Sequence, residues 1–149
     1  MREGDIHQIE VHVSGYCFQG DKILAVKRTP ERKIYPNLWE TGGGQVRRGE
    51  NFEDAVLRSM HDELGVEVEL ASTYSTYEIS VPDLPQKKIP GLRFVCRFKN
   101  YLDGQGPQIS AEHSEWRWQP VEKLDQLDFI PGVREDIAKA WKQLKSKSK

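Results

Sequence analysis

The chain has 149 residues, which suits one domain with its own hydrophobic core and gives a two-domain organisation little support. Its 22 basic and 23 acidic residues leave a formal net charge of -1, so the chain as a whole has no general attraction for nucleic acid polymers or anionic membranes. Residues 1–10 lack the apolar core of a secretory signal and no apolar run is long enough to span a membrane, so we expect a single cytoplasmic domain over residues 1–149.

The N-terminal part of the chain has the pattern of β structure. Apolar and polar residues alternate over residues 9–18, which predicts a half-buried strand. Turn-forming residues 19–21 separate this segment from the short apolar run 23–26, so the two segments are expected to form a hairpin. Residues 29–38 combine two prolines with charged side chains and predict a loop, which leads to a glycine loop at 42–44.

The second half of the chain predicts more β structure and a final helix. Residues 66–80 are typical of β structure, and residues 92–98 alternate as a strand with one exposed face. Residues 82–90 are expected to form a loop because prolines interrupt them. Between 133 and 144 apolar residues recur at helical spacing, which predicts a helix, and the lysine-rich tail 145–149 is expected to fray.

Cysteine and histidine do not form a ligand set in this sequence. Cys17 and Cys96 each lie inside a predicted strand and are expected to be buried and reduced. His61 and His113 have no cysteine or histidine partners at ligand spacing, so surface positions are favoured for both.

A helix follows the glycines. Asn51 is a good N-cap, and the acidic residues Glu53 and Asp54 complement the positive end of the helix dipole, so the helix is expected to begin at about residue 52. Gly65 is placed to end it in a left-handed conformation. The predicted apolar stripe consists of Phe52, Ala55, Val56, Met60 and Leu64.

The phase of this helix places charged groups on and beside its apolar stripe. At about 100° per residue, Glu63 projects near the middle of the stripe, while Arg58 and Asp62 lie along one edge. Carboxylates in the last turn also oppose the helix dipole, at a cost of about 0.3 to 1 kcal/mol each. A divalent cation beside glycines 42–44 would compensate both penalties, because it prefers oxygen ligands and glycine leaves the backbone accessible. The alternative is an ion pair of Glu63 or Asp62 with Arg58, which leaves ordinary surface groups.

Several positions in this region resemble the Nudix box, whose pattern is G-x5-E-x7-R-E-U-x-E-E-x-G-U with U aliphatic. The register fits without a gap, and the matching positions are Gly44, Glu50, Arg58, Met60, Glu63, Gly65 and Val66. Outside the box, Trp39 and the acidic, tryptophan-containing stretch 112–124 are also similar to the family. A chance match to so long and mixed a pattern is far rarer than a match to a short glycine motif.

The resemblance implies an α+β Nudix fold, an α/β/α sandwich with a mixed β-sheet. It also implies hydrolysis of a nucleoside diphosphate linked to another group, with Mg²⁺ or Mn²⁺ as the cofactor. By the same resemblance, the carbonyl of Gly44 and the carboxylates of Asp62 and Glu63 are the expected metal ligands. Arg58 is expected to orient the acidic side chains and Glu50 to support the site.

Two positions depart from the family pattern. Ser59 replaces the first glutamate of R-E-U-x-E-E, a position that commonly supplies a metal ligand or the base, so metal affinity and rate are expected to be lower. Asp62 replaces another glutamate and keeps its charge. Mg²⁺ often binds through one or two carboxylates plus substrate phosphates, so the remaining ligands can suffice. Glu112 is the candidate for the base with Glu115 as its alternative, and the competing interpretation of both is a charged strand edge.

Contacts to the substrate can be assigned only in outline. Arg28 ends its strand and resembles the basic strand end of many family members, where it would meet phosphates. The glycines expected to approach the substrate are Gly43 and Gly44. Packing is the favoured role for aromatic side chains, because each buries about 150 to 250 Å² in a typical core. The aromatic residues that could instead stack on a nucleobase are Tyr35, Trp39 and Trp116.

The leading hypothesis is a cytoplasmic Nudix hydrolase that cleaves a nucleotide pyrophosphate bond. Its partner is expected to be a small nucleotide, with no nucleic acid polymer and no membrane, and the chain to be a monomer or homodimer. The alternative is a catalytically weakened Nudix domain that binds nucleotides as a regulatory module, because Ser59 replaces a carboxylate. A third hypothesis, a purely structural domain with surface carboxylates, predicts no metal binding. The sequence does not name the nucleotide.

Overall fold

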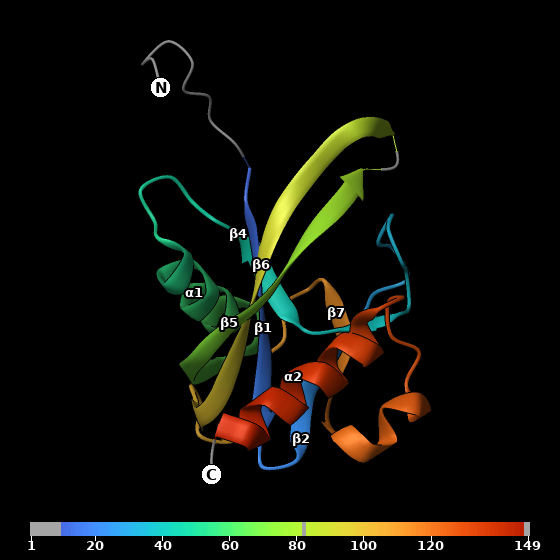
Figure 1. Ribbon diagram of the computed structural model, residues 1–149. Coiled ribbons are helices and arrows are strands. Elements are labelled where there is room, and N and C mark those ends of the chain that lie inside the picture. Colours follow the sequence, from blue (N-terminus) through green and yellow to red (C-terminus); the bar gives the residue numbers. More distant parts are fainter. Residues whose placement is uncertain (1–9, 82, 148–149) are drawn as a thin grey trace.

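The computed structural model describes residues 10–81 and 83–147 of the chain (Figure 1). Residue 9 of the first predicted strand, the rest of the N-terminal segment 1–9, Pro82 and residues 148–149 lie outside the described residues. In chain order the elements are β1 (His12–Gln19), β2 (Lys22–Arg28), β3 (Trp39–Glu40), β4 (Gly42–Gln45), α1 (Phe52–Leu64), β5 (Val66–Val81), β6 (Leu84–Tyr101), β7 (His113–Pro120), the 3-10 helix η2 (Val121–Gln126) and α2 (Val133–Lys147).

The strands form one mixed sheet of seven strands. Its main order is β3-β2-β1-β6-β5, with β4 paired to β1 and β7 paired to β2. Strand β1 runs parallel to β6 and antiparallel to β2 and β4, so the predicted mixed sheet is confirmed. The predicted hairpin is also confirmed, because β1 and β2 pair across the turn at Gly20.

Two helices cover opposite faces of this sheet, and the period of two along β1 explains how (Figure 1). Val13 and Cys17 point into the core under α1, whereas Tyr16 and Phe18 point into the core under α2. The α1 side is closed by Val56, Met60 and Leu64, and the α2 side by Val133, Ile137, Ala140 and Leu144. The predicted α/β/α sandwich is therefore confirmed.

The first helix begins and ends where its capping residues predict. The side chain of Asn51 accepts a hydrogen bond of 2.8 Å from the backbone N–H of Asp54, and Gly65 ends the helix with a φ of 67°. Four of the five predicted stripe residues are buried, but Phe52 is exposed. Phe52 is the first helical residue, and its side chain lies outside the contact between α1 and the sheet.

Strand structure extends further than the sequence predicts at two places. Residues 84–90, expected to form a loop, belong to β6 and pair with β5 in a long hairpin that projects beyond the rest of the sheet (Figure 1). Strand β1 pairs with β6 only from Gly91 onward, so Pro85 and Pro90 lie where a missing N–H removes no bond to β1. The glycines expected to form an open loop instead form β4, which pairs with the start of β1.

The C-terminal segment is helical, and both cysteines are buried. Helix α2 continues to Lys147, so residues 145–147 of the lysine-rich tail are helical in the structure. Cys17 and Cys96 are free and fully buried, as expected, and they face each other across β1 and β6. Burial raises the pKa of both thiols, that of Cys96 to about 12. Within residues 10–81 and 83–147, no helix has both the length and the apolar character needed to cross a bilayer.

Two leucines of α1 provide a test of this packing. Leu64 is fully buried beneath Gly42, so we expect Leu64→Ala to lower the free energy of unfolding by about 2–5 kcal/mol in urea titrations. Leu57 lies on the exposed side of the same helix, so Leu57→Ala is a matched control that should cost less than about 1 kcal/mol. Equal losses in the two variants would contradict the orientation of the helix.

Candidate active site

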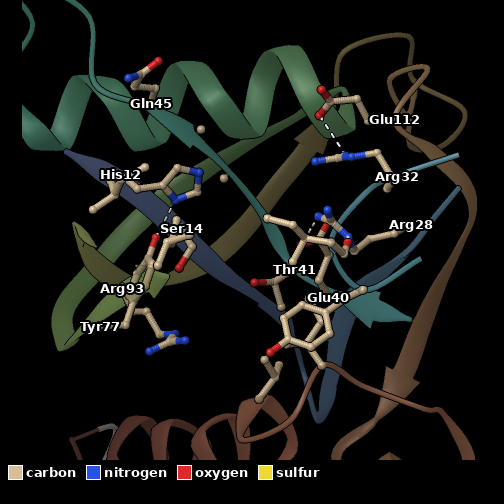
Figure 2. Close-up of a pocket in the computed structure, with 18 of the residues that line it drawn as sticks. His12, Ser14, Arg28, Arg32, Glu40, Thr41, Gln45, Tyr77, Arg93 and Glu112 are labelled. Carbon is tan, nitrogen blue, oxygen red and sulfur yellow. Dashed lines mark hydrogen bonds and ion pairs between the residues drawn. The ribbon is translucent and has the colours of Figure 1, made fainter. Parts of the chain in front are cut away.

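Two adjoining hollows lie where α1 approaches the sheet. The larger, the main cleft, has a volume of about 1010 Å³, and its lining includes His12, Arg28, Tyr35, Gly43, Gly44, Glu63, Tyr77, Arg93 and Glu112 (Figure 2). The smaller, the helix hollow, has about 500 Å³ and is lined by Gly44, Arg47, Arg58, Ser59, Asp62 and Glu63, among others. Gly44 and Glu63 line both, so they mark the junction between the two hollows.

The glycines of β4 make this junction possible because they have no side chains. A Cβ atom at Gly43 would lie 2.5 Å from the carbonyl oxygen of Val13, and one at Gly44 would lie 2.8 Å from Oγ of Ser59. Any other residue would push β4 away from β1 or from the helix. The glycines therefore serve close packing between a strand and a helix.

Arg58 fastens the segment that follows β4 to the helix. Its Nε and Nη2 atoms donate to the two carboxylate oxygens of Glu50 at 2.7 and 2.9 Å, and Nη2 also donates to the carbonyl of Gln45 at 2.8 Å. The hydrogen bonds from Arg58 lower the pKa of Glu50 to about 2. Asp62 lies 4.0 Å from Nη1 of Arg58, at the limit of an ion pair. Arg58 thus pairs mainly with Glu50 and leaves the helix carboxylates available.

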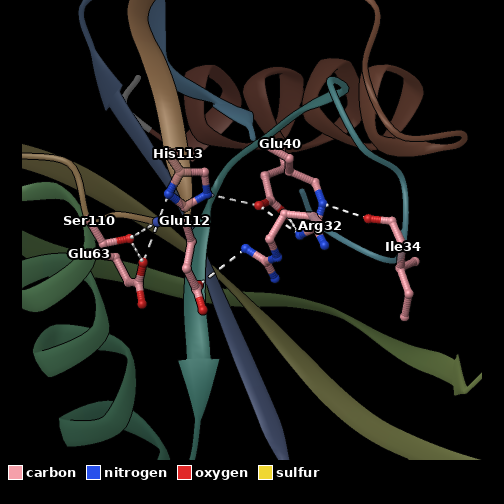
Figure 3. A network of polar contacts seen from close by, with 8 residues as sticks. Arg32, Ile34, Glu40, Glu63, Ser110, Glu112 and His113 are labelled. Atoms are coloured by element: carbon pink, nitrogen blue, oxygen red, sulfur yellow. Dashed lines mark hydrogen bonds and ion pairs between the residues drawn. The ribbon is translucent and has the colours of Figure 1, made fainter. Parts of the chain in front are cut away.

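The two carboxylates at the end of α1 have different surroundings. Glu63 is half-buried, and its Oε2 accepts a hydrogen bond of 2.7 Å from the hydroxyl of Ser110. The same oxygen lies 3.9 Å from Nδ1 of His113 (Figure 3). The Asp62 side chain is 47% exposed and lies 3.0 Å from the ring of His61, which is itself exposed as expected. Glu63 is therefore the more tightly positioned of the two carboxylates.

A polar network connects the main cleft to Glu63 (Figure 3). Nη1 of Arg28 donates to both carboxylate oxygens of Glu40 at 3.0 and 3.2 Å, and Nε2 of His113 donates to Glu40 at 2.9 Å. Burial opposes ionisation of Glu40, but the hydrogen bond from His113 and the charge of Arg28 outweigh it, so the pKa of Glu40 is lowered. The Arg28 guanidinium is thus neutralised by Glu40, although it lines the cleft as a phosphate contact would.

Three members of this network were not found from the sequence. Glu40 ends β3, whereas Ser110 and His113 belong to one turn at the start of β7, where the backbone N–H of His113 donates to the carbonyl of Ser110 at 3.1 Å. No local spacing connects Glu40 or Glu63 to this turn. The expectation that His113 lies on the surface is wrong, because only 4% of its side chain is exposed and it lies between Glu40 and Glu63. His113 reaches this buried position because it pairs with Arg28 across β2 and β7. A register shift in that strand pair interrupts the alternation of buried and exposed residues, so the sequence pattern did not predict the burial of His113.

The two candidate bases differ in position. Glu112 lines the main cleft, its side chain is 55% exposed, and its Oε2 lies 3.2 Å from Nη1 of Arg32. Glu115 lies outside that lining and pairs with Lys27 at 3.5 Å. The geometry therefore favours Glu112 over Glu115.

The three aromatic residues considered for stacking on a nucleobase differ in burial. Trp39 is buried in the core under α2, which confirms packing for this residue. The packing prediction is wrong for Tyr35 and Trp116, which are 45% and 41% exposed. Of these two, only Tyr35 lines the main cleft.

The oxygen atoms that line the helix hollow are the candidate ligands for a divalent cation. The described residues contain no group of three or more histidine, cysteine, aspartate or glutamate side chains arranged to hold a metal ion. The position where a further carboxylate is expected is Ser59, whose buried Oγ has no hydrogen-bond partner in the described part of the chain. Gly44 approaches this unpartnered oxygen closely, and Asp62 and Glu63 line the same hollow. They fit a hard cation that completes its shell with water and substrate oxygens.

The structure is an α/β/α sandwich in which carboxylates lie beside a glycine strand and next to an open cleft, an arrangement that suits metal-assisted chemistry on a phosphate. The family model of the NUDIX domain matches residues 9–140, so the chain belongs to the Nudix family. It is 28% identical over 139 residues to an isopentenyl-diphosphate Delta-isomerase of Paenarthrobacter aurescens, covering 86% of this chain and 73% of the relative. It is 33% identical over 114 residues to an RNA pyrophosphohydrolase of Roseobacter denitrificans, covering 66% of this chain and 69% of the relative.

Solved structures agree on the fold. The MutT protein from Methanosarcina mazei Go1 superimposes with a TM-score of 0.69 at 17% identity, covering 91% of this chain and 94% of that chain. The MutT-like Nudix fold and the class of nucleotide pyrophosphohydrolases are thus confirmed. The relatives' names include different activities, so the family alone does not define the substrate.

The Glu50–Arg58 contact predicts a dependence of stability on pH. The pKa of Glu50 is about 2 in the native state and lies below its ordinary value, so this contact stabilises the fold above a pH of about 4.5 and is lost as the pH falls toward 2. We expect Glu50→Gln to lower the melting temperature near neutral pH, with a gap to the wild type that shrinks below a pH of about 4.5. Arg58→Met removes the partner and should show the same pattern by circular dichroism. A gap that does not change with pH would contradict this assignment.

Proposed function

We propose that this chain hydrolyses the pyrophosphate bond of a small nucleoside diphosphate derivative at the junction of the two hollows. Gly44, Asp62 and Glu63 hold Mg²⁺ or Mn²⁺ there, and the main cleft takes the nucleotide. The observation that carries the proposal is that Gly44 and Glu63 line both hollows, so an ion in one can contact a diphosphate in the other. The proposal includes one cytoplasmic domain, a monomer or homodimer, and no nucleic acid polymer or membrane as partner.

The relatives and the charges of the cleft support a diphosphate bound with a metal ion. The two relatives described above have names that refer to a diphosphate group, although their reactions differ. The cleft arginines in the described part of the chain are already paired, Arg28 with Glu40, Arg32 with Glu112 and Arg93 with Asp136. A diphosphate therefore finds little uncommitted guanidinium charge. A divalent cation held by Gly44, Asp62 and Glu63 would supply further charge neutralisation and would make a water molecule more nucleophilic.

The protein residues have separate tasks in this proposal. Arg58 and Glu50 hold the segment after Gly44 against α1, which fixes the position of the metal ligands. Glu112 is exposed in the main cleft and accepts the proton of the attacking water. Glu40 is a poorer base, because its two hydrogen-bonding partners stabilise the charged form.

The second candidate function is a nucleotide-binding module with weakened catalysis. Ser59 favours it, because a hydroxyl without charge replaces a carboxylate in the helix hollow. Such a module would bind a nucleotide in the main cleft without turning it over. The two functions therefore differ in turnover and not in the location of the ligand.

Removal of the Glu63 charge tests the hydrolase. Metal assistance contributes several kcal/mol, so we expect Glu63→Gln to lower kcat by about 10²-fold or more on any nucleotide that the wild type hydrolyses with Mg²⁺. The readout is a phosphate-containing product resolved by chromatography from a panel of nucleotides. Glu67→Gln is the matched control, since Glu67 is an exposed carboxylate just beyond the same helix. Unchanged activity of Glu63→Gln would refute this assignment of the site.

Restoring a carboxylate at Ser59 tests the metal site directly. We expect Ser59→Glu to bind Mn²⁺ about tenfold more tightly, because a further negative oxygen ligand enters the helix hollow. Calorimetry with Mn²⁺ gives the affinity without any substrate. Ser59→Gln has the same size without the charge and should show no gain. No gain in Ser59→Glu either would exclude this hollow as the metal site.

A further inference from the structure

The loop at residues 29–38 is held firmly at one side of the main cleft. Nε of Arg28 donates to the carbonyl of Ile34 at 2.9 Å, and the backbone N–H of Arg28 donates to the carbonyl of Leu38 at 2.9 Å. On its other flank, Arg32 pairs with Glu112 at 3.2 Å. The loop is therefore fastened to β2 and to the residue that serves as the base in the proposed function.

Tyr35 has an unusual conformation within this loop. Its φ is 49°, in the left-handed region that is costly for a large side chain and favours glycine or asparagine. Tyr35 is 45% exposed and lines the main cleft. Within residues 10–81 and 83–147, the Tyr35 side chain makes no hydrogen bond, ion pair or ring contact that would offset the free-energy cost of this backbone conformation. Strained conformations of this kind persist where the surroundings impose them, and they cluster at ligand clamps.

The opposite wall of the cleft carries planar side chains that contact one another. Figure 2 shows His12, Tyr77 and Arg93 on one side and Arg28, Arg32 and Glu112 on the other. The guanidinium of Arg93 lies 4.2 Å from the centre of the Tyr77 ring, and the Tyr77 hydroxyl lies 2.7 Å from Nδ1 of His12. Both walls thus offer planar groups instead of isolated charges.

We propose that Tyr35 is the stacking platform for the nucleobase of the substrate. The proposal rests on the proposed function, because it places the base at the loop side of the cleft while the diphosphate lies at Gly44 and Glu63. The loop anchors fix the backbone that carries Tyr35 at the cleft before the substrate arrives, so the loop itself needs little ordering on binding. A ring face recognises any aromatic base, because every base has a π face. Tyr35 therefore selects nucleotides over diphosphates without a base, and does not select one base over another.

The contribution of the ring can be measured by binding. Stacking on one aromatic side chain corresponds to an affinity change of about tenfold. We expect Tyr35→Leu to weaken binding of non-hydrolysable methylene analogues of ATP and CTP by about tenfold in calorimetry with Mg²⁺, while Tyr35→Phe binds like the wild type. Inorganic triphosphate has no base, so all three proteins should bind it equally. Asn37→Gly is a matched control in the same loop, since Asn37 also has a positive φ of 64° but lies outside the cleft lining.

The outcomes separate this inference from the proposed function. Loss of nucleotide affinity in Tyr35→Leu alone, with equal melting temperatures in all variants, supports the platform whether or not the wild type hydrolyses nucleotides. Equal nucleotide affinity in Tyr35→Leu and wild type overturns the platform and leaves the hydrolase intact. The platform is also overturned if the wild type binds no nucleotide analogue, or if Tyr35→Leu weakens inorganic triphosphate equally. Absence of turnover with normal nucleotide binding counts only against the hydrolase.

Discussion

The close approach of β4 to α1 is the constraint on which the rest of the site depends. Cβ atoms at Gly42 and Gly44 would lie 2.7 Å from Leu64 and 2.8 Å from Ser59, so only glycine lets this strand lie against this helix. The contact brings the backbone of Gly44 to the helix end that carries Glu63. Without it, the metal ligands proposed here would belong to two unconnected surfaces.

The site combines a local unit with a non-local one. The local unit runs from β4 through the Arg58–Glu50 contact to the end of α1, and all of it lies within about one supersecondary motif. The non-local unit joins Glu40, His113 and Glu63 from β3, β7 and α1. Because His113 contacts both Glu40 and Glu63, the packing of β7 on β2 connects the cleft to the carboxylate end of the helix.

Sequence patterns predicted elements whose determinants are local. Asn51 and Gly65 mark the ends of α1, and alternation marks the strands near β1 and β6, because caps and side-chain period depend on neighbouring residues alone. The failures have a different origin. Pro85 and Pro90 were expected to break β structure, but they lie beyond the reach of β1, where the missing N–H removes no bond to that strand. Glycines 42–44 were expected to form a loop, but β1 provides a pairing partner.

The sequence by itself determined the family, the α/β/α architecture and the set of residues on α1 that face the glycines. These follow from helical periodicity and from a motif whose spacing is fixed along one stretch of chain. Only the tertiary structure decided that Arg28 is paired with Glu40, that His113 is buried beside Glu63, and that the Tyr35 ring is open to the cleft. The physical reason is that these contacts depend on sheet register and loop anchoring between distant segments, which no local spacing encodes.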